Sequence, residues 1–69
     1  MLCKFTMVYS DVGEEALWVN PILVTCIEET KEGTKIYFTG GDEDYAVVKE
    51  PISEVTSTIN TQLDVAFKY

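Results

Sequence analysis

Carboxylates are the side chains through which this chain could act on another molecule. The 69 residues include 12 Asp or Glu against 5 Lys, with neither Arg nor His, so the formal net charge is −7. Carboxylates held on a rigid surface can take the place of phosphates and bind the basic residues of a nucleic-acid-binding protein. The same charge repels nucleic acid and anionic lipid, so we expect neither direct nucleic-acid binding nor membrane insertion. The acids expected to gather in one place are Asp11, Glu14, Glu15, Glu28, Glu29, Glu32, Glu50 and Glu54.

Other kinds of chemistry lack their usual residues. General acid–base and nucleophilic catalysis commonly recruit His, which is absent here. Cys3 and Cys26 without His do not form a usual zinc site, and the 42–44 acidic run lacks the alternating ligands of a calcium loop. We therefore expect no enzymatic activity, no cofactor and no metal. A metal-independent enzyme that uses a pair of carboxylates is the third and least favoured alternative. It would need an acid whose pKa is raised by apolar neighbours, and no acid here has such neighbours.

Periodic patterns predict the elements that must position the acids. Alternating apolar and polar residues, separated by turn residues, predict strands over about 2–9, 16–19, 23–29, 35–39 and 45–49. Ile52, Val55, Ile59 and Leu63 share one helical face and predict an amphipathic helix over about 52–62. Residues 64–69 alternate again, which fits either an edge strand or an ordered tail. The fold class expected is α+β, a small antiparallel β-meander of about five strands closed by one C-terminal helix.

The predicted turns determine where the acids lie. Alternate turns of an antiparallel sheet share one end, so the turns at 11–15 and 30–34 lie together, and the strand over 45–49 returns toward that end. Lys31 and Lys49 are expected among the acids, while the 42–44 run lies at the opposite turn. Because loops are solvated and commonly polar, solvation alone is the simpler interpretation of this cluster.

Length and composition limit the class of protein. A chain this short forms one domain, residues 1–69, and buries too little surface to build a large concave active site. The two cysteines, each among apolar neighbours, are expected to be reduced thiols in the core. No apolar run approaches the about 20 residues of a membrane span, and the N-terminus lacks the layout of a secretory signal, so a cytoplasmic location is expected.

Several short motifs resemble the FlbD/SwrD family of small swarming and flagellar proteins. They cover roughly the middle half of the chain: Val19-Asn20-Pro21, Leu23-Val24, Ile27-Glu28, Thr34, Ile36, Phe38, Thr39-Gly40-Gly41, Val47-Val48-Lys49-Glu50 and Glu54-Val55. The resemblance implies a compact β-meander closed by a C-terminal helix and brings no catalytic residue with it. Small domains similar to this one look at home in bacteriophage genomes as well, so a phage-encoded relative, acting in the host cytoplasm, is a further expectation beside a bacterial origin.

These observations lead to two hypotheses about function. The first is a small inhibitor of the phage type, which a phage would use to take over its host cell. Its acidic end would occupy the basic DNA-binding surface of a host protein such as the nucleoid protein HU. On this hypothesis, Glu14→Lys combined with Glu29→Lys abolishes binding and leaves the fold intact. The alternative is a structural or regulatory partner of a motility or membrane-associated assembly, as the resemblance implies. It would bind through an apolar sheet face or an exposed edge strand, and a homodimer through edge strands is one form of such binding.

Overall fold

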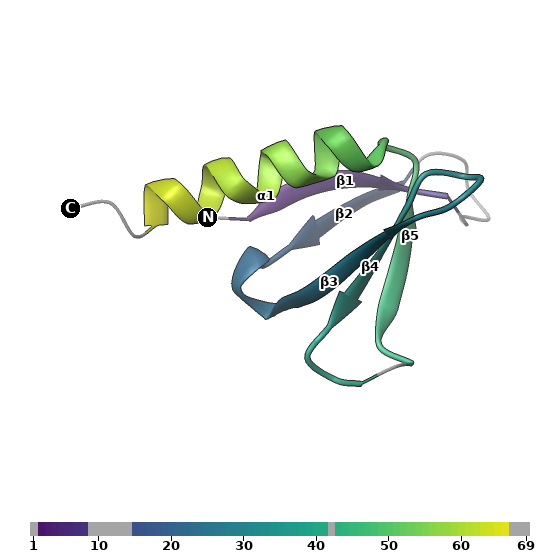
Figure 1. Ribbon diagram of the computed structural model, residues 1–69, viewed down its shortest axis with the longest axis horizontal. Coiled ribbons are helices and arrows are strands. Elements are labelled where there is room, and N and C mark those ends of the chain that lie inside the picture. The colour runs from purple at the N-terminus through teal and green to yellow at the C-terminus, as the bar shows by residue number, and fades with distance from the viewer. Residues whose placement is uncertain (1, 9–14, 42, 67–69) are drawn as a thin grey trace.

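The protein folds as one antiparallel sheet with one helix, as the sequence predicts. A computed structural model describes residues 2–8, 15–41 and 43–66. Five strands form one sheet, and a single long helix follows them, which confirms the α+β class (Figure 1). The elements are β1 (Cys3–Met7), β2 (Glu15–Val19), the 3₁₀ turn η1 (Pro21–Leu23), β3 (Val24–Glu29), β4 (Thr34–Phe38), β5 (Tyr45–Val48) and α1 (Ile52–Ala66).

The strands are not arranged in sequence order. The order is β2-β1-β5-β4-β3, with antiparallel neighbours throughout, so β5 lies between the two hairpins. Pro21 starts η1 between β2 and β3; its ring removes a backbone donor, so the chain turns there without continuing the ladder. β1 meets β5 at the pair Met7↔Val48, flanked by hydrogen bonds from Lys49 N to Thr6 O (2.8 Å) and from Val8 N to Val47 O (3.0 Å).

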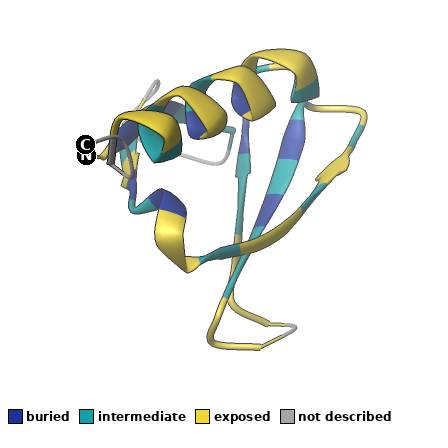
Figure 2. Cartoon of the chain, turned by 60° about the vertical axis from the view of Figure 1, so that its left-hand side comes forward, coloured by how far each residue is buried: buried dark blue, intermediate teal, exposed yellow. Residues whose placement is uncertain are grey.

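The core lies between α1 and one face of the sheet. Val55 and Ile59 of α1 are buried against residues of four strands, and Leu63 packs at the edge of the same cluster. Figure 2 shows the buried residues of α1 facing those of the sheet. Each such aliphatic or aromatic side chain contributes about 1.5–3 kcal/mol when fully buried. The buried sheet residues are Cys3, Phe5, Val19, Ile36 and Val48.

The helix is longer than its apolar periodicity indicates. α1 continues to Ala66, so Asp64, Val65 and Ala66 belong neither to an edge strand nor to a tail. No Pro or Gly follows Leu63 to stop the helix, and Ala is the best helix former. Val65 is 64% exposed because this last turn has passed the core. Residues 67–69 lie outside the described part of the chain.

The two cysteines have different environments, contrary to the expectation that both are in the core. Cys3 is buried, but Cys26 is exposed. The pairing of β3 with β4 shifts between Val24 and Cys26, which places Cys26 opposite Tyr37 on the sheet face away from α1. The apolar neighbours of Cys26 predict a core position, but side chains alternate along a strand, and the next residue, Ile27, is the one that packs against the core.

This difference predicts two rates of thiol modification. Burial raises the pKa of the Cys3 thiol, which lowers its thiolate fraction, and also shields it from reagents, whereas the Cys26 thiol is exposed. We expect a disulfide reagent at neutral pH to modify one thiol per chain rapidly and the second only as the protein unfolds. Mass spectrometry of the partly modified protein assigns the sites. Rapid modification of Cys3 under native conditions would contradict the packing of α1 on β1.

The described residues contain no helix long and apolar enough to cross a membrane.

Candidate functional site: an acidic end of the sheet

One row of paired residues crosses the whole sheet and marks the end where acids gather. Glu15 of β2 pairs with Met7, Met7 with Val48, Val48 with Thr34, and Thr34 with Glu29 of β3. The three central residues are apolar or buried, and a glutamate occupies each edge. The two glutamates are separated by four strand spacings of about 4.8 Å each, less any shortening from the twist of the sheet.

Two neighbouring segments bring further acids to this end. The turn between β3 and β4 carries Glu32, and α1 begins here with Glu54 in its first turn, close to the end of β5 (Figure 1). We define the acidic end as Glu15, Glu28, Glu29, Glu32, Glu50 and Glu54. Asp11 and Glu14, which the sequence also assigns to this cluster, lie outside the described residues.

A tight turn holds the segment that carries Glu32. Thr30 N donates to Gly33 O (2.9 Å), and Gly33 N donates to the Thr30 hydroxyl oxygen (3.1 Å). Gly33 has a φ of +152°, and a Cβ there would collide with the carbonyl oxygen of Val48. Only glycine fits this close approach between the turn and the end of β5.

Glu50 has a structural role that distinguishes it from the other acids. Its two carboxylate oxygens accept hydrogen bonds from Thr6 N, at 2.9 and 3.1 Å, and its carbonyl oxygen accepts one from the buried Thr34 hydroxyl at 2.8 Å. The side chain is half-buried. Glu50 therefore joins β1, β4 and the entrance of α1, and its charge is partly engaged within the fold.

Removing this carboxylate should lower stability. In Glu50→Ala, the backbone N–H of Thr6 loses its acceptor in a partly buried position, which costs about 1–3 kcal/mol. Glu50→Gln retains one acceptor oxygen and should lose less than half of that. Urea unfolding followed by circular dichroism measures both. Equal stability of the alanine and wild-type proteins would mean that the carboxylate does not hold β1.

The five other acids are exposed, but they are not equivalent. Glu28 belongs to the next row, where it pairs with Lys35 on the face away from α1. The Lys35 ammonium lies 4.0 Å from the ring centre of Tyr45 and 4.9 Å from that of Tyr37. A hydrogen bond to Tyr37 raises the pKa of Lys35, and the Glu28 carboxylate acts in the same direction. Glu28 thus faces a base, and it adds less negative potential than Glu29 or Glu32.

The presence of an acid at Glu54 also has a local structural explanation. A carboxylate in the first turn of a helix interacts favourably with the positive end of the helix dipole, by about 0.3–1 kcal/mol. Glu29 and Glu32 have no comparable role among the contacts described. They carry the strongest argument that this end has a function beyond folding.

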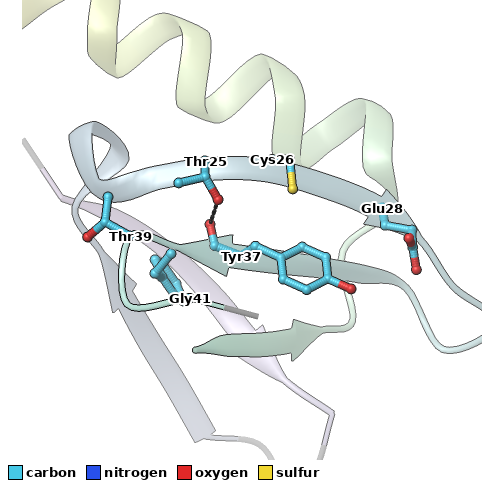
Figure 3. Close-up of a pocket in the computed structure, with 7 residues that line it drawn as sticks. Thr25, Cys26, Glu28, Tyr37, Thr39 and Gly41 are labelled. Carbon is cyan, nitrogen blue, oxygen red and sulfur yellow. Dashed lines mark hydrogen bonds between the residues drawn. The ribbon is translucent and has the colours of Figure 1, made fainter. Parts of the chain in front are cut away.

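The sheet face away from α1 carries a shallow hollow of about 520 Å³. It lies over β3 and β4 and is lined by Thr25, Cys26, Glu28, Tyr37, Phe38, Thr39 and Gly41 (Figure 3). The Thr25 hydroxyl donates to the carbonyl oxygen of Tyr37 (3.3 Å), so it is engaged with the backbone. Within the described residues, no three His, Cys, Asp or Glu side chains are grouped to hold a metal ion. Residues of β3, of β4 and of the turn after β4 line the hollow, and they include one exposed thiol.

Comparisons with known proteins add no relative. No family model matches the chain, and searches of curated proteins and of solved structures return no match. The resemblance to the FlbD/SwrD family therefore stays a prediction, and function has to be argued from the site.

Sequence reasoning missed two features of this region. The bond from Thr6 N to Glu50 joins residues 44 positions apart, and no local pattern indicates such a contact. The positions of Lys4 over Trp18 (5.7 Å) and of Lys35 over two tyrosines depend on cross-strand register. Once the pairing is known, Lys4↔Trp18 follows directly from it.

Proposed function

We propose that this protein is a non-enzymatic binding protein whose acidic end occupies the basic, nucleic-acid-binding surface of another protein. The observation that supports the proposal is the row ending in Glu15 and Glu29, with exposed Glu32 and Glu54 at the same end of the sheet. A duplex presents a regular array of phosphates, and a protein surface that binds phosphates positions itself mainly by charge. Fixed carboxylates can satisfy such a surface.

The proposal depends on carboxylates held in fixed positions, and not on net charge alone. Glu29 is the last residue of β3, Glu32 is in a hydrogen-bonded turn, and Glu54 is in the first turn of α1. Side chains on ordered elements lose less conformational entropy on binding than side chains on a disordered acidic tail. The partner we propose is a basic host protein such as the nucleoid protein HU, and the inhibitor would be of the phage type.

A competition experiment tests the proposal. Purified HU is bound to fluorescently labelled duplex DNA, and this protein is then titrated in. The labelled DNA should be released, and the affinity for HU, measured without DNA, should fall steeply with added salt because the contacts are ionic. If the DNA stays bound at saturating protein, HU is not the partner. If a protein captured from lysate resists high salt and excess duplex DNA, charge mimicry is wrong for any partner.

The second candidate function, a partner in a motility or membrane-associated assembly, has an observation of its own. Large apolar side chains are exposed away from the acidic end, before β1, in η1 and in the last turn of α1: Leu2 (52%), Ile22 (50%), Leu23 (46%) and Val65 (64%). Binding through these side chains would persist at high salt, because apolar burial does not depend on screened charges. The same salt series therefore separates the two candidates.

A further inference from the structure

β2 is an edge strand, and its outer edge is open. It ends the strand order, and among the described residues nothing pairs with it beyond β1. Ala16 and Trp18 are exposed, and Leu17 is half-buried. A row of unpaired backbone groups on such an edge is a template for another strand.

Known hydrogen bonds identify the backbone groups that point outward. Thr6 N and Thr6 O both bond toward β5, through Glu50 and Lys49, so Thr6 does not bond to its β2 partner Ala16. Because bonding alternates along an antiparallel pair, Phe5↔Leu17 is a hydrogen-bonded pair and Thr6↔Ala16 and Lys4↔Trp18 are not. The N–H and C=O groups of Ala16 and Trp18 therefore point away from the sheet.

This pattern is self-complementary. If a second copy lies antiparallel with its two-fold axis at Leu17, Ala16 pairs with Trp18 of the second copy, and Trp18 with Ala16 of the second copy. All four outward N–H groups of the two strands then find an outward C=O. The indole lies opposite a methyl group, so a large side chain faces a small one. Glu15 lies opposite Val19 of the second copy, and no two like charges are paired.

The other edge of the sheet does not have these properties. β3 carries Glu28 and Glu29, and its register shift near Cys26 interrupts a regular edge. Edge charges and bulges are the usual devices that prevent strand addition. β2 has one acid, at its first residue, and four apolar residues after it.

Charge distribution favours the same arrangement. With a net charge of −7 on each copy, two chains associate most easily where their acids are far apart. In the antiparallel pairing, the acidic end of one copy lies beside the opposite end of the other copy's β2. The two acidic ends then point in opposite directions along the joined sheet, whereas a parallel pairing would bring them together.

We propose that the protein forms a two-fold homodimer in which β2 pairs antiparallel with β2 of a second copy, centred on Leu17. The result is one continuous sheet of ten strands, twice the five of each copy. This inference is independent of what the acidic end binds.

Oligomeric state under substitution tests the pairing. Ala16→Pro removes an outward donor and leaves the bonds from β2 to β1 intact, and proline is tolerated at an edge position of this kind. Ala16→Val is the matched control, because it retains the donor and favours a strand. By sedimentation, we expect wild type and Ala16→Val to be dimers at about 100 μM. Ala16→Pro should be a folded monomer at that concentration, with the dimer dissociation constant raised at least about tenfold.

A cross-link tests the register and does not depend on whether Ala16→Pro folds. In a Cys26→Ser background, Leu17→Cys places two thiols at a non-hydrogen-bonded pair, with Cα atoms about 4.5 Å apart, which is within the range of a disulfide. Mild oxidation should rapidly join the two copies of the Leu17→Cys variant by a disulfide. Trp18→Cys, which faces Ala16 of the second copy, should link much more slowly.

Any one of four results would contradict the proposed dimer. The first is a wild-type protein that stays monomeric up to about 1 mM, a concentration at which even weak pairs associate. The second is a folded Ala16→Pro variant that dimerises as wild type does. The third is equal cross-linking of Leu17→Cys and Trp18→Cys. A monomer whose β2 edge binds an extended segment of some other protein also contradicts the proposal.

Discussion

Gly33→Ala is expected to remove a large fraction of the protein's free energy of unfolding. The new Cβ would collide with the carbonyl oxygen of Val48 and lie 3.0 Å from the carbonyl carbon and oxygen of Lys49. These are backbone atoms at the junction of β5 with β1 and β4, so they cannot rotate away as a flexible side chain would. Overpacking and the positive φ together cost about 2–4 kcal/mol. A domain of this size has about 3–10 kcal/mol of total stability, so this is a large fraction.

Gly41→Ala provides the control for Gly33→Ala. Gly41 has a φ of +110°, but among the described residues that are not its chain neighbours, none has an atom within 4 Å of the position a Cβ would take. Only backbone strain applies, so a loss of about 1–2 kcal/mol is expected. Thermal unfolding followed by circular dichroism compares the two variants. If Gly41→Ala is as destabilised as Gly33→Ala, the close approach of the 30–33 turn to β5 is not what requires glycine.

Reversing two charges at the acidic end should remove partner binding and leave the fold intact. Glu29→Lys with Glu54→Lys replaces two exposed carboxylates by ammonium groups, which would face the partner's own basic residues. Like-charge pairs at an interface cost several kcal/mol, so we expect the affinity for the basic partner to fall at least about 100-fold. The double variant keeps Glu50, whose carboxylate holds Thr6 N. Calorimetric titration at low salt measures the affinity.

A second double variant separates charge placement from net charge. Glu43→Lys with Asp64→Lys changes the net charge by the same amount, but at the turn before β5 and near the end of α1. Both original side chains are exposed. Binding should weaken only slightly, mainly through long-range attraction, which salt screens over about 8 Å. Equal losses in the two double variants would mean that total charge, and not the acidic end, determines binding.

Local patterns in the sequence were sufficient for the fold class and for the buried face of the helix. Val55 and Ile59 recur at helical spacing, and they are buried where that spacing predicts. Alternation likewise located β1, in which Cys3 and Phe5 point to the core and Lys4 to solvent. Such inferences succeed because side-chain direction follows backbone periodicity within one element.

The failures have local and long-range causes. The apolar neighbours of Cys26 predict a core position, but its side chain is exposed because Ile27, the next residue in the strand, packs against the core. The apolar periodicity predicts a helix end near residue 62, but helix propensity continues α1 to Ala66. The bond between Glu50 and Thr6 depends on how β5 meets β1, and no local pattern indicates it. The edge glutamates of the sheet row, Glu15 and Glu29, could be assigned to one end because turn positions alone place them there.

The meeting of β1 with β5 also determines the order in which the chain can fold. The hairpins β1–β2 and β3–β4 join residues close in sequence, so each closes a short loop at little entropic cost. The Thr6–Glu50 contact closes a loop of 44 positions, and it becomes favourable only after both hairpins exist. We therefore expect the hairpins to be formed in the folding transition state and the junction to be largely absent. Stabilising the junction would slow unfolding without speeding folding, which prolongs the lifetime of the native protein.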